Sequence, residues 1–152
     1  MDRNSGVDIE KALFEAFIVP RKKRRYVELV GTKRGREKIR LSLDHFADLD
    51  PRFCHRINPS EHLLPSILKK LKDLGAPSEC YVASSDAELD GQEMDLTQAL
   101  KDVVGRGMGT FLSCLTGRLA YFESEERNER YICFVPSRAG VGTEELNNRI
   151  TE

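Results

Sequence analysis

The stretch from Asp95 to Phe134 constrains the fold more than any other part of this 152-residue chain. It opens with apolar residues at steps of three and four, which predicts a helix with one apolar face. Asp95 stands where an N-cap is needed, and Gln98 follows at the spacing of a reciprocal capping box. We therefore expect a helix that begins after Asp95 and buries Leu96, Ala99, Leu100, Val103 and Val104.

A glycine-rich segment, Gly105–Gly109, ends this helix and is predicted to reverse the chain. Three segments rich in Phe, Tyr, Leu and Ile follow, and turn residues separate them, which is typical of antiparallel strands. These predicted strands are Thr110–Leu115, Arg118–Glu123 and Arg130–Val135.

The dipeptide Thr116-Gly117 fits a two-residue hairpin loop between the first two of these strands. With that loop, Leu112 faces Tyr121 and Phe111 faces Phe122. The two phenylalanines would then form an aromatic pair on one face of the sheet.

The first half of the chain is dominated by helical patterns. Helices are predicted over Val7–Val19, with Asp8 and Glu10 in the first turn, and over Arg21–Val30. Thr32 is positioned to cap a third helix. A fourth opens at Asn58-Pro59-Ser60 and presents a buried stripe of Leu63, Leu64, Ile67, Leu68, Leu71 and Leu74.

Two further strands are predicted over Arg52–Ile57 and Cys80–Ala83, and an acidic loop over Ser84–Glu93. Together the patterns predict the α+β class, with an antiparallel sheet of about four to five strands packed with helices that lie mainly in the N-terminal half. We expect a single domain over residues 7–136 and a loose C-terminal tail over 137–152.

The apolar runs are shorter than the roughly 20 residues of a membrane span, and the polar N-terminus is unlike a signal peptide. We therefore expect a cytoplasmic protein without a membrane partner. The four cysteines form no C-x-x-C pair, which argues against a zinc ribbon and favours buried, reduced thiols.

The most informative compositional feature is the basic segment 21–40, which holds ten Lys or Arg against two acids in a chain of net charge −1. It predicts a surface for an acidic protein or a nucleic acid, with Arg21–Arg25 positioning the anion and Arg34 with Arg36 forming a second patch. The alternative is that acidic loops of the same chain, or water, neutralise it. The candidate residues are Arg21, Lys22, Lys23, Arg24, Arg25, Lys33, Arg34 and Arg36.

Other candidate sites carry weaker signals. The glycines of Gly105–Gly109 follow a helix, whereas phosphate loops precede one, so a cap is favoured over an anion site. A ligand there would contact Arg106, Gly107 and Thr110. The segment Asp86-x-Glu88-x-Asp90-Gly91 resembles part of a calcium loop, but Thr97 occupies the position of its bidentate carboxylate.

The histidines at positions 45, 55 and 62, with Cys54, match no metal-ligand spacing. No metal, cofactor or catalytic centre is therefore expected. The favoured function is a small binding or interaction protein that contacts an anionic partner through residues 21–40. The alternative is a small enzyme whose pocket lies between the Gly105–Gly109 reversal and the sheet, with Arg106, Thr110 and Ser113 holding the substrate.

Overall fold

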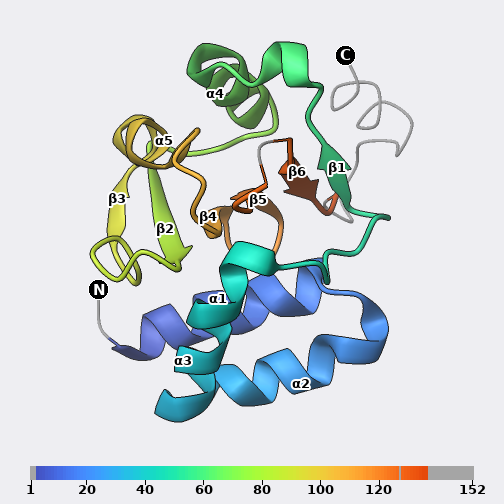
Figure 1. Cartoon of the computed structure of the whole chain (residues 1–152), viewed down its shortest axis with the longest axis vertical. Coiled ribbons are helices and arrows are strands. Elements are labelled where there is room, and N and C mark those ends of the chain that lie inside the picture. Colours follow the sequence, from blue (N-terminus) through green and yellow to red (C-terminus); the bar gives the residue numbers. More distant parts are fainter. Residues whose placement is uncertain (1–2, 127, 137–152) are drawn as a thin grey trace.

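Among the residues that the structure describes, six strands form one antiparallel sheet with helices on both of its faces (Figure 1). The computed structural model describes residues 3–126 and 128–136. The strands lie in the order β1-β6-β5-β4-β2-β3. Their bounds are β1 (Cys54–Arg56), β2 (Glu79–Ser84), β3 (Glu93–Asp95), β4 (Thr110–Leu115), β5 (Leu119–Glu123) and β6 (Arg130–Phe134).

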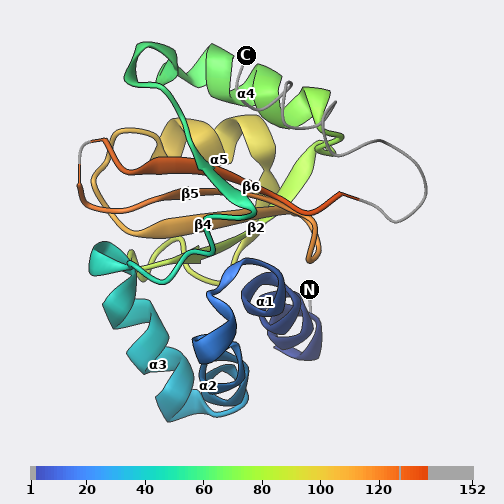
Figure 2. The same cartoon turned by 90° about the vertical axis from the view of Figure 1, so that its right-hand side faces the viewer.

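The helices form two layers. The first three cover one face of the sheet, and the other two cover the opposite face (Figure 2). They are α1 (Arg3–Phe17), α2 (Pro20–Val30), α3 (Lys33–Ser42), α4 (Leu64–Asp73) and α5 (Leu96–Val103), with 3-10 turns η1 (Leu43–His45) and η2 (Pro59–Glu61). The predicted α+β class is confirmed, as is the concentration of helices in the first half of the chain.

The layer of α1–α3 packs on an aromatic core. The rings of Phe111 and Phe122 have centroids 4.5 Å apart, and Phe46 lies 5.4 Å from Phe111. Phe14 of α1 contacts Phe111 edge-on at 5.9 Å. Such aromatic pairs contribute about 0.5–1.5 kcal/mol each beyond the area they bury.

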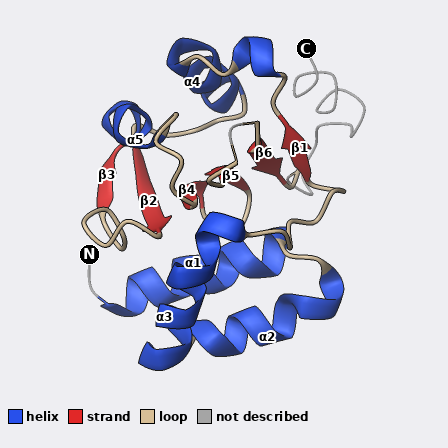
Figure 3. Ribbon diagram, in the orientation of Figure 1, coloured by secondary structure: helices blue, strands red, loops and turns tan. Residues whose placement is uncertain are grey.

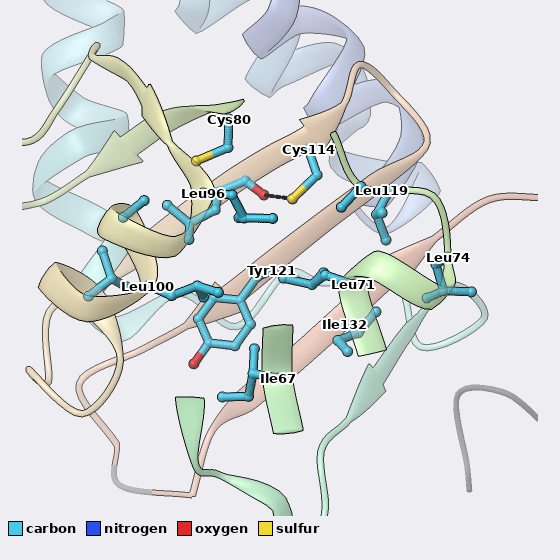
Figure 4. Packing of buried hydrophobic residues seen from close by; sticks show 14 of the residues in the cluster. Ile67, Leu71, Leu74, Cys80, Leu96, Leu100, Cys114, Leu119, Tyr121 and Ile132 are labelled. Carbon is cyan, nitrogen blue, oxygen red and sulfur yellow. Dashed lines mark hydrogen bonds between the residues drawn. The ribbon is translucent and has the colours of Figure 1, made fainter. Parts of the chain in front are cut away.

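The opposite core lies between the sheet and the helices α4 and α5. Tyr121 projects from β5 among Ile67, Leu71 and Leu100 (Figure 4). Because successive residues of a strand point to opposite faces, β4 and β5 are apolar on both sides. This explains why their sequences read as continuous apolar runs.

The register of the central hairpin is as predicted: Phe111 pairs with Phe122 and Leu112 with Tyr121. The loop is longer than expected. Leu115 pairs with Leu119, so three residues connect the strands, and a register shift accompanies them. Gly117 takes a positive φ of 69°, which a side chain would strain.

Several boundaries differ from the sequence expectation. Helix α1 begins at Arg3, before Val7, so Asp8 and Glu10 are not in its first turn. The predicted fourth helix divides into η2 and α4, which leaves Leu63 69% exposed between them. The sheet gains β3 as a sixth strand because Glu93–Asp95 pairs with β2, although its charged sequence lacks a strand pattern.

The helix α5 has half of the predicted capping box. The carboxylate of Asp95 accepts a hydrogen bond from the Gln98 amide at 2.9 Å. The Gln98 side chain, however, donates to Asp102 within the helix. The predicted tail over 137–152 lies outside the described residues. Within the described part of the chain, no helix is both long and apolar enough to cross a bilayer.

Candidate functional site

The basic segment folds into two helices, α2 and α3, which are joined by Gly31 and Thr32 and cross each other (Figure 3). This helix–turn–helix unit is called the α2–α3 hairpin below. Thr32 caps α3 by accepting a hydrogen bond from the Gly35 amide at 3.0 Å, as the sequence predicts. Gly35 is also a packing requirement. A Cβ there would lie 2.4 Å from the Leu29 carbonyl oxygen, so only glycine lets α2 and α3 meet this closely.

Most of the basic side chains point away from the core. On α2, Arg21, Arg24 and Arg25 are exposed. On α3, the exposed basic residues are Lys33, Arg34 and Lys38. Within the described residues, the only ion pair that any of these six makes is the exposed contact of Arg24 with Glu28 at 3.2 Å. These positive charges are therefore available at the surface.

An apolar side chain lies on the same outer face of α3. Leu41 is 63% exposed and follows Arg34 by seven residues and Lys38 by three. Residues at those spacings share one side of a helix. The outer face of α3 thus combines a leucine with flanking cations.

Three members of the basic segment form ion pairs or hydrogen bonds with other parts of the chain. Lys22 contacts Asp48 at 2.9 Å. Arg40 donates to the Ser85 carbonyl at 2.7 Å as well as to Glu37. Arg36 is almost enclosed, so it does not form the second surface patch expected with Arg34.

Arg36 joins two acidic groups from distant parts of the chain. Its guanidinium contacts Glu10 of α1 at 2.5 Å and Asp90 of the acidic loop at 2.6 Å. Glu10 is only 4% exposed and also accepts a hydrogen bond from the hydroxyl of Tyr81. Burial lowers the pKa of Arg36, but the two carboxylates outweigh burial and raise it above its ordinary value.

A cleft of about 690 Å³ lies over this cluster, between α1, the α2–α3 turn and β2. Its lining includes Glu10, Arg36, Tyr81 and Asp90, with Lys11 and Lys33 also present. The cluster links α1, α3, the acidic loop and β2, and its two carboxylates share the single enclosed cation Arg36. The sequence gives no local signal for it, because its members are up to 80 positions apart.

The glycine reversal binds carboxylates of the chain itself. The Gly109 amide donates to Asp44 at 2.7 Å, and the Gly105 amide donates to Glu123 at 3.3 Å. A Cβ on Gly109 would lie 2.0 Å from the Leu43 carbonyl oxygen. The segment Leu43-Asp44 thus lies against the Gly109 backbone and occupies its amide.

The residues predicted to contact a ligand at the reversal are dispersed. Arg106 and Gly107 are exposed, whereas Thr110 is buried in β4. The hydroxyl of Thr110 bonds to Ser84 at 2.8 Å and to the Met108 carbonyl at 3.0 Å. Ser113, the further candidate of the enzyme hypothesis, is also buried.

Glu123 is the most perturbed carboxyl group near the reversal. Burial raises its pKa, and the contacts with Tyr121 at 2.7 Å and Arg130 at 3.8 Å offset only part of this effect. A buried carboxyl of raised pKa can act as an acid. Here its Oε1 atom accepts from the Tyr121 hydroxyl and the Gly105 amide, which gives it a structural role.

The carboxylates of the acidic loop 86–91 accept hydrogen bonds from neighbouring backbone amides. Asp86 accepts from the Glu88 amide at 2.9 Å, and Asp90 accepts from the Ser84 amide at 2.9 Å as well as from Arg36. In residues 3–126 and 128–136, no group of three or more His, Cys, Asp or Glu side chains is arranged to hold a metal ion.

The histidines lie apart from one another. His45 contacts Glu125 at 2.7 Å, and His62 contacts the Ile57 carbonyl at 2.9 Å. Burial lowers the pKa of His55. Cys54 lies in the lining of a second cavity of about 470 Å³, next to Phe46 and Tyr131.

Comparisons with known proteins return no match to a family model, a curated protein or a solved structure.

Proposed function

We propose that this protein is a binding protein that docks an acidic protein surface onto the outer face of the α2–α3 hairpin. The observation that carries the proposal is the set of six exposed basic residues on α2 and α3, of which Arg34 and Lys38 share a face of α3 with the exposed Leu41. The docking residues are Arg21, Arg24, Arg25, Lys33, Arg34 and Lys38. Clustered cations attract an acidic partner and speed its association.

The mixed chemistry of this face favours a protein over a nucleic acid. Glu28 and Glu37 interrupt the cations, so the segment lacks the continuous basic stripe that is typical of contact with a phosphate backbone. Leu41 offers an apolar anchor of the kind that protein interfaces bury at their centre. The net charge of −1 is also low for a nucleic-acid-binding domain, which is usually basic as a whole.

The hairpin is well suited to present a fixed surface. Lys22 and Tyr26 both bond to Asp48, which ties α2 to the chain beyond α3. Arg36 ties α3 to α1 and to the acidic loop. A surface held in this way loses little conformational entropy when a partner binds.

The proposal does not extend to catalysis, because the amides of the glycine reversal already bind Asp44 and Glu123. We further propose a cytoplasmic location. All four cysteines are free thiols, which suits a reducing compartment.

Fluorescence anisotropy with two labelled peptides, polyglutamate and an alternating Glu-Leu peptide, tests this function. We expect both to bind, with affinity falling as salt rises, because exposed charges are screened. The variant Arg24→Glu with Arg25→Glu should lose binding. Its control is Lys69→Glu with Lys72→Glu on the exposed side of α4, which changes the net charge equally and should bind as the native protein does.

Equal binding by the two double variants would overturn the proposal. A single-stranded DNA oligonucleotide provides the competing probe. Tighter binding of DNA than of the Glu-Leu peptide, lost in the Arg24→Glu and Arg25→Glu variant, would assign the surface to nucleic acid.

A further inference from the structure

Two cysteines face each other across neighbouring strands at the edge of the sheet. Cys54 of β1 pairs with Cys133 of β6. The flanking backbone bonds are Phe134 N to Phe53 O at 2.9 Å and Ile57 N to Arg130 O at 2.8 Å. Hydrogen-bonded pairs alternate with non-hydrogen-bonded pairs along an antiparallel ladder, so Cys54 and Cys133 occupy a non-hydrogen-bonded position.

This position brings the two side chains close together. Residues opposed in this way have Cα atoms about 4.5 Å apart and point to the same face of the sheet. Disulfides span Cα separations of about 4.4–6.8 Å. Both cysteines belong to the core beneath α1–α3, so the two sulfur atoms can meet with little backbone movement.

Of the two buried cysteines, Cys54 is the one that lines a cavity. Cys54 is 6% exposed and lies in the lining of the cavity of about 470 Å³, whereas Cys133 is fully buried beneath it. The Cys54 thiol donates a hydrogen bond to the Phe17 carbonyl at 3.7 Å, which orients its Sγ atom. The arrangement thus has an outer thiol and an inner thiol.

We propose that Cys54 and Cys133 form a reversible dithiol–disulfide site whose oxidant is a small disulfide, such as oxidised glutathione. The Cys54 thiolate attacks one sulfur of the oxidant, forms a mixed disulfide and releases one glutathione thiol. The Cys133 thiol, whose pKa is raised by burial, then attacks Cys54 Sγ and passes its proton to the departing glutathione sulfur, which forms the protein disulfide and releases the second glutathione. The protein loses two electrons and two protons, and the oxidant gains both.

The other two cysteines provide an internal comparison. Cys80 and Cys114 lie on the adjacent strands β2 and β4, but the ladder between these strands ends at Tyr81 and Ser113. A register shift in β4 includes Cys114, and its thiol bonds to the Leu112 carbonyl at 3.7 Å (Figure 4). In the continued register Cys80 would lie opposite Cys114, and it also pairs with Met94 of β3 on the other side of β2. Burial raises the pKa of both thiols, so neither readily forms the thiolate that attacks a disulfide. We therefore expect these two thiols to remain reduced.

Oxidation would link the edge strand β1 covalently to its neighbour β6. Strand β1 has three residues and is joined to the helical layer by the loop after η1 (Figure 3). A bond between β1 and β6 closes a loop of 80 residues counting both cysteines. Closing a loop of that length restricts the unfolded chain strongly and should raise the melting temperature by about 10 °C.

The experiment incubates the folded, full-length chain with oxidised glutathione at about pH 8, where thiolate forms. Thiols are then counted after denaturation, and the linked peptides are mapped by mass spectrometry. We expect two thiols to be lost and Cys54 to be linked to Cys133. The variant Cys133→Ala should instead stop at a single glutathione adduct on Cys54, and Cys54→Ala should give no adduct.

The matched control replaces Cys80 and Cys114 with alanine and should form the disulfide as the native chain does. If a variant fails to fold, as judged by its thermal transition, the peptide map of the native chain still decides. Four free thiols after incubation, or a link through Cys80 or Cys114, would overturn the proposal.

Discussion

The guanidinium of Arg36 lies 2.5 Å from the carboxylate of Glu10, and this contact joins α3 to α1 inside the molecule. The same guanidinium reaches Asp90, so one cation from the basic segment pairs with two carboxylates. The basic residues of segment 21–40 therefore fall into two groups. Arg36 stabilises the fold through buried ion pairs, whereas residues such as Arg24 and Arg34 are exposed at the surface.

Replacement of Arg36 by methionine should destabilise the protein by about 3–5 kcal/mol, because it leaves the buried Glu10 carboxylate without its cation. Urea denaturation measures the change. The matched control is Arg34→Met on the exposed side of the same helix, which should alter the free energy of unfolding by less than about 0.5 kcal/mol. Equal losses in the two variants would mean that the buried cluster does not stabilise the fold.

Gly109→Ala should cost about 3 kcal/mol, because the new Cβ meets the Leu43 backbone at 2.0 Å and displaces the segment that supplies Asp44. Gly91→Ala is the control. Gly91 has a positive φ of 82° but nothing within 4 Å of a new Cβ, so only about 1 kcal/mol of backbone strain is expected. Thermal denaturation of both variants gives the comparison, and a smaller loss for Gly109→Ala would contradict the packing argument.

Leu41→Ala should weaken binding of the alternating Glu-Leu peptide by about tenfold while leaving polyglutamate binding unchanged, since only the first peptide offers an apolar partner. Stability should stay within about 0.5 kcal/mol, because Leu41 is exposed. Leu63→Ala, at the other large exposed leucine among the described residues, should affect neither peptide. Unchanged affinity in Leu41→Ala would remove this residue from the docking surface.

The pH dependence of stability should change with opposite signs in two variants. The pKa of Glu123 is raised by burial above its ordinary 4.5, so its proton favours the folded state at low pH. The stabilisation of the folded state by this proton is fully present below pH 4.5 and is lost as the pH rises through the raised pKa of Glu123. The difference in unfolding free energy between Glu123→Gln and the native protein should therefore favour the variant more at pH 7 than at acidic pH.

The second variant, Asp50→Asn, removes a carboxyl group whose pKa is lowered, so its effect on stability should depend on pH in the opposite direction. Hydrogen bonds from Arg52 lower the pKa of Asp50 below its ordinary 3.8. Its contribution is present above pH 3.8 and is lost as the pH falls through the lowered value. Asp50→Asn should thus be destabilising at pH 7 and progressively less so in acid. Urea denaturation across pH 2–7 checks both variants, and parallel curves for variant and native protein would refute the assigned shifts.

Local features were predictable where the interaction spans a few residues. Thr32 and Asp95 cap their helices because a side-chain oxygen reaches an amide three residues on. The pairing of Phe111 with Phe122 was predicted by placing one hairpin loop at Thr116-Gly117 and counting residues outward along both strands. The pairing is correct although the loop has three residues. In each case the physical cause is contained in a short window of sequence.

The sequence by itself determined the fold class and the position of the basic segment, because hydrophobic periodicity and charge composition are local properties of the chain. Only the tertiary structure decided which of those cations remain free, since Glu10, Asp48 and Asp90 reach Arg36 and Lys22 across long stretches of chain. The same holds for the facing pair of Cys54 and Cys133. Contacts of this kind depend on how strands and layers assemble, and no spacing along the chain encodes them.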